Sequence, residues 1–549
     1  MVNQFIIRNI YFFIIFVLIC IHFILGLDTI KHNSVTFDEH VHLTAGYSYL
    51  KTGKYYLNIL DHPPISKMYS ALPLLLMNPM LLTNHPYWLN YQQYSFADLF
   101  IYNNKVDAER MLNSSRIMML ILSCILGILI FLWAKRLYGI SSGIFALILY
   151  LFNSNFIAHG TLVTTDLSLS IFYFLSIYIF WCWINNPRII TVVILGITTA
   201  LTLTTKFSGI LIFIVYIFLL LLPNVKEKNR LSPQQFRSQV CLFFITVLTS
   251  VFSIYKIKYI GLYIQGLENI FKSVNVGRAA FLMGDYSNTG WLHYFLITFL
   301  IKTPIPFLIL LILSLILQFR NLLKIDKVIL LLPVLVYFLF SSISKQQIGL
   351  RYILPIYPFL FIFVSEIINN VSIKNRLNLN FYFKFFIITL FLVWYIYSCI
   401  KIHPWHISYF NEIIGGPENG YKFLTDSNID WGQGLKELGN WYKKNNLKGI
   451  YLSYFGTGDP HYYGIKYIPI GFVNPMLPEM RSGDKISFSS KDNIFFAISV
   501  TNLQATYYEN KKVFNWLKEI RPYKIISYSI FIYDLTDKPF LLKNLYSTF

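Results

Sequence analysis

The sequence predicts an all-α polytopic membrane protein with about 11 transmembrane helices, followed by a small C-terminal extracytoplasmic α/β domain. Two observations predict this fold class. Of the 549 residues, 55% are hydrophobic, 18% are aromatic and only 13% are charged. Apolar runs of membrane-spanning length recur as far as Ile402; beyond it they shorten to strand length, while Gly, Pro, Asp and Asn return. This composition excludes a soluble enzyme.

The first part of the chain divides into apolar segments, because a membrane-spanning helix needs about 17 to 25 mostly apolar residues. The segments lie near 10–27, 113–133, 141–158, 164–184, 189–205, 207–222, 240–260, 291–318, 328–344, 352–370 and 385–401. No convincing small-residue cleavage site follows the first segment, so we expect a retained membrane anchor. Lys302-Thr303-Pro304 interrupts the eighth segment and predicts a kink, with the lysine reaching toward the interface.

Basic residues gather in one of the two alternating sets of loops. That set holds Arg8, Lys135, Arg136, Arg188, Lys226, Lys228, Arg230, Arg237, Arg320, Lys324, Lys327, Lys374, Arg376 and Lys384. Its short loops contain almost no acidic residues, as the positive-inside rule expects of cytoplasmic loops. We therefore expect a multi-pass protein of the plasma (inner) membrane with a cytoplasmic N-terminus. The net charge of +20 has the same explanation, so no nucleic-acid partner is expected.

The change in composition predicts two domains. Residues 1–402 are expected to form the transmembrane domain, with an external loop at 28–112, and residues 403–549 the extracytoplasmic α/β domain. Asp430 is expected to cap a helix running to Lys444, with Gln433 completing a capping box. The other elements expected in this domain are strands over 449–455, 494–500 and 524–534 and a helix over 511–520.

The external loop after the first segment contains the densest group of reactive side chains. It includes Asp38, Glu39, His42, Tyr55, Asp61, His62 and Lys67. Asp38 and Glu39 follow the segment by about ten residues, so they can lie at the interface where a lipid headgroup presents its reacting bond. A carboxylate there can act as a general base toward an acceptor hydroxyl or amine. The alternative is a solvated acidic pair that caps an external helix.

A second acid, Asp166, lies at the external mouth of the third and fourth segments. An ionisable residue at a span end in such a charge-poor chain is a functional candidate, and its alternative role is a helix cap. Cations recur on the same side, at Lys67, Arg116, Lys206, Arg278 and Arg351. Together they suit a phosphate or diphosphate leaving group, whereas each alone is typical of an interfacial anchor.

Metal binding is a second interpretation of the loop histidines. His40, His42 and His62 lie near carboxylates, and imidazole with carboxylate suits zinc or manganese. Their spacing matches no compact zinc pattern, so a divalent metal stays open as a cofactor and no cofactor is certain. All five cysteines fall inside apolar segments, which excludes a disulfide framework in the external loops.

The order of these motifs resembles a known family. Phe37-Asp38-Glu39 with His42, Gly53, Tyr55, His62-Pro63-Pro64 and Lys67 is similar to the first external loop of the polyprenyl-phosphate-sugar-dependent glycosyltransferases (glycosyltransferase family 39). These include the dolichyl-phosphate-mannose protein mannosyltransferases and the lipid A aminoarabinose transferases. Later matches are Arg116, 135–139, Asp166, 205–207, 281–284, 290–291, 302–304 and 351–355. The resemblance therefore extends over nearly all spans.

This resemblance implies a glycosyltransferase C fold and an inverting transfer of a hexose or pentose from an undecaprenyl or dolichyl phosphate donor in the membrane. Asp38 would be the catalytic base, Glu39 its neighbour, and Asp166 would position the acceptor or the base. The donor phosphate would be held by His62, Lys67, Arg116, Lys206 and Arg351. Further substrate contacts would come from His42, Tyr55 and Arg278. The acceptor would be an extracytoplasmic glycolipid, polysaccharide or protein.

Two features leave alternatives open. No β-trefoil domain fits between the later spans, as it does in the protein mannosyltransferases, which favours a bacterial relative with another acceptor. The tail is expected either to recognise that acceptor or to stabilise the protein.

A lipid or glycolipid transporter or flippase is the rival function, although such proteins place ionisable groups near the bilayer midplane. A noncatalytic scaffold of the same fold is the third possibility.

Overall fold

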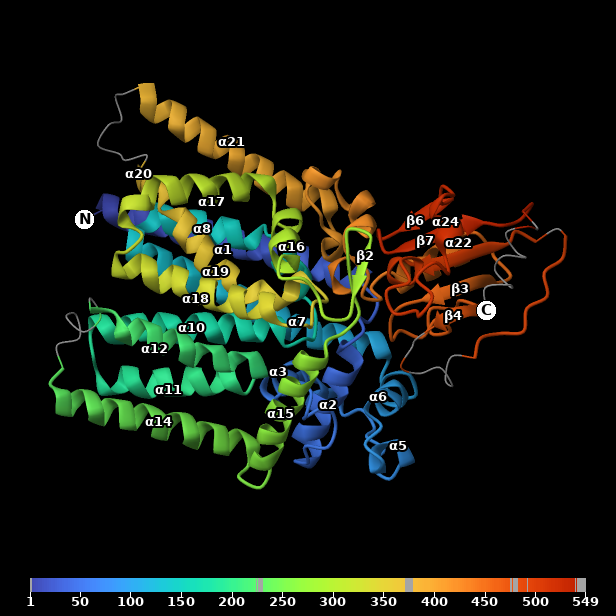
Figure 1. Cartoon of the computed structure of the whole chain (residues 1–549), viewed down its shortest axis with the longest axis horizontal. Helices are drawn as coiled ribbons and strands as arrows, with labels where there is room; N and C mark the ends of the chain where they lie inside the picture. The colour runs from blue at the N-terminus through green and yellow to red at the C-terminus, as the bar shows by residue number, and fades with distance from the viewer. Residues whose placement is uncertain are drawn as a thin grey trace.

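The computed structural model describes residues 2–223, 225, 231–370, 379–473, 476, 482–490, 492–538 and 540. It consists of a long helical bundle with a small sheet domain at one end (Figure 1). Five of the basic residues expected on the cytoplasmic side, Lys226, Lys228, Arg230, Lys374 and Arg376, lie outside the described residues.

Most of the bundle consists of helices that are long enough to cross a membrane. The long helices are α1 (Val2–His32), α7 (Ala108–Tyr138), α10 (Asp166–Asn185), α14 (Pro233–Tyr255), α18 (Ile325–Ile343) and α21 (Leu379–Ile402). A further span combines η3 (Leu350–Ile356), α19 (Tyr357–Ser365) and α20 (Ile367–Asn370). By length and apolar composition, the described part of the chain contains seven candidate spans of this kind.

The remaining spans are broken or short. α8 (Ile140–Leu151) and α9 (Ser154–Gly160) meet at 65°, and α16 (Tyr294–Lys302) and α17 (Ile305–Gln318) at 113°. Counting each bent pair as one span gives up to nine in the described chain. The two shorter apolar helices are α11 (Ile189–Leu203) and α12 (Leu211–Leu221), which follows η1 (Phe207–Ile210). Each of the eleven predicted segments thus overlaps one helix or a run of consecutive helical elements.

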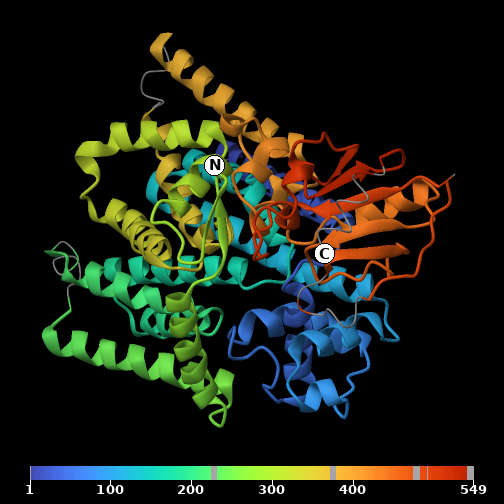
Figure 2. The same ribbon diagram turned by 45° about the vertical axis from the view of Figure 1, so that its right-hand side comes forward.

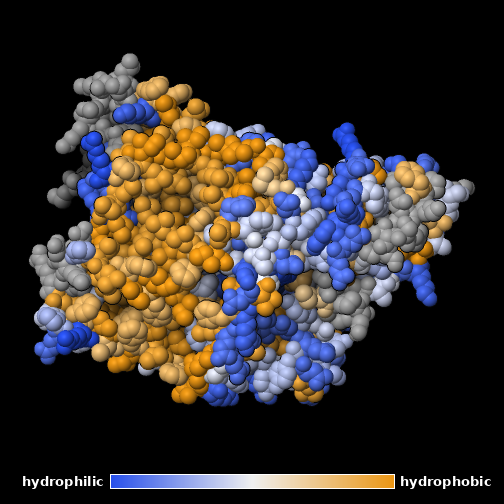
Figure 3. Space-filling view, viewed as in Figure 1, coloured by the Kyte–Doolittle hydropathy of each residue, from blue (hydrophilic) through white to orange (hydrophobic). Residues whose placement is uncertain are grey.

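The bundle has a broad apolar surface, with hydrophilic residues concentrated at its two ends (Figure 3). A helix that exposes Leu, Ile and Phe over such a surface is stable only where lipid surrounds it. The predicted fold class, a polytopic helical membrane protein with a small C-terminal α/β region, is therefore confirmed, and the protein crosses the membrane several times.

Short helices cover the end of the bundle that faces the sheet domain (Figure 2). After α1 come α2 (Glu39–Thr52), α3 (Ile65–Ser70), α4 (Leu72–Met77), α5 (Pro86–Leu89) and α6 (Gln93–Tyr102). α2 and α3 approach closely at Gly46, where an added Cβ would lie 2.0 Å from the carbonyl oxygen of Lys67. A larger residue at position 46 would therefore push these two helices apart.

The seventh span begins and ends earlier than the sequence predicts. α14 begins with a complete capping box at Ser232 and ends at Tyr255, because Lys256 adopts a left-handed conformation with φ of 50°. α15 (Ile260–Val276) then runs across the end of α14 (Figure 1). It leads into a hairpin of β1 (Ala280–Leu282) and β2 (Asp285–Ser287). After the left-handed turn, residues 256–260 therefore leave the span.

The C-terminal domain contains a five-stranded mixed sheet with the order β4-β3-β5-β7-β6. Its strands are β3 (Ile450–Tyr454), β4 (Tyr467–Val473), β5 (Phe495–Ser499), β6 (Lys524–Ile526) and β7 (Ile530–Asp534). β3 is parallel to β4 and β5, with Leu452 opposite Ala497, whereas β7 is antiparallel to β5 and β6. Its helical elements are η5 (His406–Ser408), η6 (Glu412–Ile414), η7 (Pro417–Lys422), η8 (Asp426–Asn428), α22 (Leu435–Lys444), α23 (Val500–Leu503) and α24 (Asn515–Lys518).

Several local expectations for this domain were wrong. α22 begins at Leu435 after Gly434, so Asp430 is not its cap. The strand expected over 524–534 is a hairpin, because Ser527 and Tyr528 have positive φ values of 51° and 57° and reverse the chain. β4 was missed because it contains a proline and a glycine, and the helix expected over 511–520 is only the short α24.

Candidate active site

Asp38 lies at the start of α2, on the side of the bundle that faces the C-terminal domain. It occupies the N-cap position, but its side chain makes no capping hydrogen bond. Its Oδ2 lies 3.1 Å from Nη1 of Arg351, and the carboxylate is 22% exposed. Asp38 is therefore paired with a cation and still open on one side.

Asp166 begins α10 and is completely buried. Lys206 Nζ donates to its Oδ1 at 2.6 Å, and Arg351 Nη1 lies 3.4 Å from its Oδ2. A single nitrogen of Arg351 therefore joins carboxylates from α2 and α10. The ring of Tyr352 lies beneath both cations, 4.7 Å from Lys206 and 5.4 Å from Arg351. Asp166 is the first residue of α10, and its carboxylate forms ion pairs there. The alternative role expected for Asp166 was that of a helix cap, but the N-cap residue of α10 is Thr165.

One donor of this cluster is unused. Nε of Arg351 is buried and makes no hydrogen bond within the described residues. A buried guanidinium N–H without a partner is unfavourable, so this position suits an anionic ligand.

Glu39 follows Asp38 but points into the protein. Its carboxylate binds Arg116 at 2.9 Å and 2.5 Å, and it also accepts the backbone N–H groups of Thr36 and Val163. Both side chains of this ion pair are 0% exposed. The remaining donors of Arg116 reach backbone carbonyls at Asn33 and Ser34, each at 2.8 Å. The pair therefore fixes the backbone that precedes Asp38 and leaves no donor of Arg116 for a phosphate.

Lys67 is also fully engaged by the protein. Its ammonium donates to the carbonyls of Asn58 and His62, both at 2.7 Å, and to the hydroxyl of Tyr49 at 3.2 Å. Burial lowers the pKa of Lys67 well below its usual value, against the opposing charge of Asp61. Lys67 thus holds the loop before α3 in place, and its geometry does not favour the expected phosphate contact.

His42 and His62 lie beside the carboxylate cluster. Their rings are 5.0 Å apart and perpendicular, and Nδ1 of His42 lies 3.0 Å from the carbonyl of Val163. Burial lowers the pKa of both imidazoles, and the cations Lys67 and Lys206 lower that of His62 further. Both rings are therefore neutral near pH 7. Nδ1 of His62 has no partner in the described chain, so it can bond a ligand.

Tyr55 and Arg278 were also candidates for substrate binding. Tyr55 donates to the carbonyl of Ile254 at 2.6 Å and stacks on Tyr259, so it packs the external loop against the end of α14 and the turn that follows it. Arg278 lies over the ring of Tyr507 at 5.2 Å, and the carboxylates of Asp426 and Asp38 are among the charges around it. Arg278 therefore faces the cluster, whereas Tyr55 does not.

The C-terminal domain adds residues that sequence reasoning missed as site residues. Trp431 lies against Arg351, with the guanidinium 4.2 Å from its ring centre, and Tyr507 donates to the carboxylate of Asp426. The sequence did contain a signal for these site residues, since a short polar loop with two aspartates and a tryptophan is unusual. It was interpreted as a turn before a helix, because nothing in the sequence places residue 431 beside residue 351.

The expected kink at Lys302 is present, but the lysine does not reach the interface. It is 2% exposed and donates to the carbonyls of Ile407 at 2.8 Å and Asn428 at 2.5 Å. Lys302 therefore fastens the C-terminal domain to the bundle. Within the described residues, no group of three or more His, Cys, Asp or Glu side chains is placed to hold a metal ion.

Asp430 gives the C-terminal domain a pH-dependent stability. Its buried carboxylate accepts the N–H of Thr501 at 2.9 Å, and burial raises its pKa from 3.8 to about 7. The folded state then holds the proton more tightly than the unfolded chain. The stabilisation is therefore fully present below about pH 4 and is lost as the pH rises through about 7.

We expect Asp430→Asn to remove this dependence, because the amide keeps the shape of the carboxyl group and cannot ionise. Thermal melting in detergent between about pH 5 and pH 8 measures it. The wild type should lose stability across this range more steeply than the variant. Asp537→Asn, at an exposed position, is the control, and equal slopes for wild type and Asp430→Asn would contradict the expectation.

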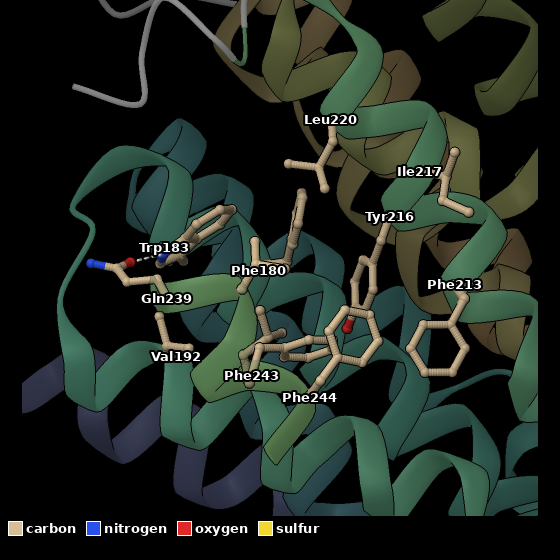
Figure 4. Close-up of a pocket in the computed structure, with 12 residues that line it drawn as sticks. Phe180, Trp183, Val192, Phe213, Tyr216, Ile217, Leu220, Gln239, Phe243 and Phe244 are labelled. Atoms are coloured by element: carbon tan, nitrogen blue, oxygen red, sulfur yellow. Dashed lines mark hydrogen bonds between the residues drawn. The ribbon is translucent and has the colours of Figure 1, made fainter. Parts of the chain in front are cut away.

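An apolar pocket of about 340 Å³ lies between α10, α11, α12 and α14 (Figure 4). Phe180, Tyr216 and Phe243 line it, and Trp183 donates to Gln239 at 2.7 Å at its edge. Phe180 follows Asp166 by about four turns of α10, or roughly 20 Å. The pocket is lined mainly by apolar side chains and suits an apolar chain.

Fold and site together define a multi-pass membrane protein in which buried acids and cations meet where the bundle faces the C-terminal domain. Residues 85–255 match the family described as dolichyl-phosphate-mannose-protein mannosyltransferase. The predicted resemblance to the polyprenyl-phosphate-sugar glycosyltransferases is therefore confirmed on this segment. It carries Arg116, Asp166 and Lys206, while Asp38 and Arg351 lie outside it.

Two solved proteins are similar in shape. ArnT from Cupriavidus metallidurans bound to undecaprenyl phosphate is 12% identical with a TM-score of 0.48, and the alignment covers 95% of this chain and 98% of that one. The archaeal oligosaccharyltransferase AglB from Archaeoglobus fulgidus, with an inhibitory peptide and a dolichol-phosphate, is 9% identical with a TM-score of 0.44, covering 86% of this chain and 61% of AglB. No curated protein sequence matches the chain.

Proposed function

We propose that this protein is an inverting glycosyltransferase that moves a sugar from a polyprenyl-phosphate donor to an extracytoplasmic acceptor. The observation that carries the proposal is the cluster in which Arg351 joins Asp38 and Asp166, with Lys206 on the far side of Asp166. A general base and two phosphate-binding cations then lie within one site at the membrane surface. The family match over residues 85–255 supports the same reaction class.

In the proposed reaction, the Asp38 carboxylate takes the proton of an acceptor hydroxyl. The acceptor oxygen forms a bond to the anomeric carbon while the bond from that carbon to the phosphate oxygen breaks. The electron pair leaves with the polyprenyl phosphate, whose added negative charge falls between Lys206 and Arg351. Because this is a single displacement, the configuration at the anomeric carbon inverts.

The ion pairs of the site have a role in this scheme. Before the donor binds, Arg351 neutralises the buried Asp166 and the half-buried Asp38, since charges removed from water need partners. When the donor phosphate arrives, Arg351 can transfer part of its hydrogen bonding to the phosphate. Asp38, the more exposed of the two acids, then becomes available as a base, while Asp166 stays paired with Lys206.

The proposal also assigns the topology. Residues 1–402 are the transmembrane domain with the catalytic loop at 28–112, and residues 403–549 are the extracytoplasmic domain. The membrane is the plasma (inner) membrane, with the N-terminus in the cytoplasm. The positive-inside pattern of the loops supports this orientation.

Lys206→Gln tests the phosphate assignment. The variant loses a charge-assisted contact to the phosphate, so its affinity for a polyprenyl phosphate should fall by about 10- to 100-fold. Titration of purified protein in detergent measures the affinity. Lys51→Gln, an exposed external lysine, should bind like the wild type. Unchanged affinity in Lys206→Gln would remove this lysine from the donor site.

The rival function, a lipid flippase, is tested in proteoliposomes with a labelled polyprenyl-phosphate sugar. The transferase consumes the donor and produces polyprenyl phosphate, whereas a flippase moves intact donor between leaflets. Asp166 and Lys206 lie at span ends rather than at the middle of a span, which supports the transferase. Movement of intact donor without consumption would support the flippase instead.

A further inference from the structure

Two arginines approach Asp38, and an aromatic residue of the C-terminal domain covers each of them. The guanidinium of Arg351 lies 4.2 Å from the ring centre of Trp431, and that of Arg278 lies 5.2 Å from the ring centre of Tyr507. Both distances are within the range of a cation–π contact. Arg278 lies in the loop between α15 and β1, and Arg351 lies in η3 of the bundle, so each contact joins the two domains at the site.

Trp431 is held rigidly beside the proposed base. It is 2% exposed, and its carbonyl accepts the N–H of Phe37, the residue before Asp38, at 3.0 Å. The next residue, Gly432, has a φ of 94°, and an added Cβ would lie 2.8 Å from the hydroxyl of Tyr454. This turn fixes the direction of the chain at Trp431. One residue therefore contacts the backbone at Asp38 and the side chain of Arg351.

Tyr507 is part of a stack that ends at the same place. Its ring is nearly parallel to that of Phe455, with centres 5.5 Å apart, and Phe455 stacks on Phe37 at 5.2 Å. The hydroxyl of Tyr507 donates to Asp426. Arg278 thus lies at the end of a column of three rings that begins next to Asp38.

The loop that carries Trp431 also forms hydrogen bonds with the backbone just before Arg351. The side chain of Asn428 accepts the N–H of Leu350 at 3.0 Å, and the hydroxyl of Ser427 donates to the carbonyl of Ile348 at 2.7 Å. Lys302 holds the carbonyl of Asn428 from the other side. Residues 426–431 of the C-terminal domain therefore contact the segments of both Asp38 and Arg351.

We propose that the C-terminal domain completes the catalytic centre, with Trp431 and Tyr507 as positioning residues that hold Arg351 and Arg278 in place for the phosphate of the lipid donor. This inference rests on the proposed function and goes beyond it, because it assigns the domain a direct part in donor binding. A guanidinium that lies on a ring face keeps its in-plane N–H groups free for oxygen ligands. Without Trp431, Arg351 can settle onto Asp38 and Asp166 and bind the phosphate less well.

A double-mutant cycle tests Trp431. Affinity for a polyprenyl phosphate is measured for the full chain as wild type, Trp431→Leu, Arg351→Gln and the double variant. Trp431→Leu should weaken binding by roughly 3- to 30-fold in the wild-type background. In the Arg351→Gln background it should change binding by less than about 2-fold, because the arginine that it positions is absent. A purely structural tryptophan would instead weaken binding equally in both backgrounds, which would overturn the proposal.

Conservative variants test the proposal even where a leucine variant does not fold. Trp431→Phe keeps a ring face and should retain most of the affinity even if Trp431→Leu fails to fold. Tyr507→Phe should bind better than Tyr507→Leu, and the effect of Tyr507→Leu should disappear beside Arg278→Gln. Tyr523→Leu, at a position that is 58% exposed, is the control. Equal affinity of the phenylalanine and leucine variants at both positions would overturn the proposal.

The same measurement separates this inference from the proposed function. A wild type that binds polyprenyl phosphate, with additive effects in both cycles, contradicts only the positioning role. A wild type that binds no polyprenyl phosphate contradicts the donor site itself and the inference with it.

Discussion

Asp38→Asn should lower the rate of sugar transfer by about 10²- to 10⁴-fold, because the amide keeps the shape of the carboxylate but cannot accept the proton of the acceptor. Binding of polyprenyl phosphate should remain, since Lys206 and Arg351 are unchanged. The rate is measured with purified protein, a labelled polyprenyl-phosphate sugar and membrane extract as the source of acceptor.

Asp61→Asn is the matched control for this variant. Asp61 lies in the same external loop, is exposed and is bonded to Asn58 and Gln93 rather than to a cation. It should retain transfer. Transfer by Asp38→Asn at the wild-type rate would remove Asp38 from the role of base.

Loss of the ion pair between Arg116 and Glu39, the residue next to Asp38, should lower the stability of the protein. Arg116→Met leaves the carboxylate of Glu39 buried without a cation, and loss of one partner of such a pair costs about 3–5 kcal/mol of folding free energy. We therefore expect a strong fall in melting temperature and in the yield of folded protein. Thermal melting in detergent measures the effect, while Asp38→Asn should melt close to the wild type because Asp38 is partly exposed.

A double replacement, Glu39→Leu with Arg116→Met, should recover much of the stability because it removes both charges together. The single Arg116→Met protein melting like the wild type would contradict a buried structural pair. A Glu39→Gln protein that folds normally but loses transfer as fully as Asp38→Asn would instead show that Glu39 takes part in the chemistry.

The fold could be predicted largely from the sequence, because each span needs a long apolar run whatever its neighbours are. The prediction was wrong where local backbone geometry decided the outcome. Lys256 ends α14 in a left-handed conformation, and Ser527 and Tyr528 turn one expected strand into two. These positions carry ordinary residue types, so nothing in the sequence marked them.

The candidate site could be predicted only in part. Motif order and sidedness suggested Asp38, Asp166, Lys206 and Arg351, and the structure brings these four together. The same reasoning could not distinguish them from Glu39, Arg116 and Lys67, which are acidic and basic residues as well. The two groups differ in their hydrogen-bond partners, because Glu39, Arg116 and Lys67 bind backbone groups of the protein.

The contribution of the C-terminal domain was beyond prediction for a different reason. Trp431 and Arg351 are far apart in sequence, and their contact depends on how a separate sheet domain sits on the bundle. Apolar patterning specifies the core of that domain, but it says nothing about which loop meets the membrane surface.

The consumption of donor by the wild-type protein tests the central claim most directly. Purified protein is incubated with labelled polyprenyl-phosphate sugars and membrane extract, and both products are counted. A transferase yields one polyprenyl phosphate for each sugar moved to the acceptor, with inverted anomeric configuration. Tight binding of the lipid phosphate with no donor consumed, whichever sugar is supplied, would contradict the assignment of the site as a glycosyltransferase centre.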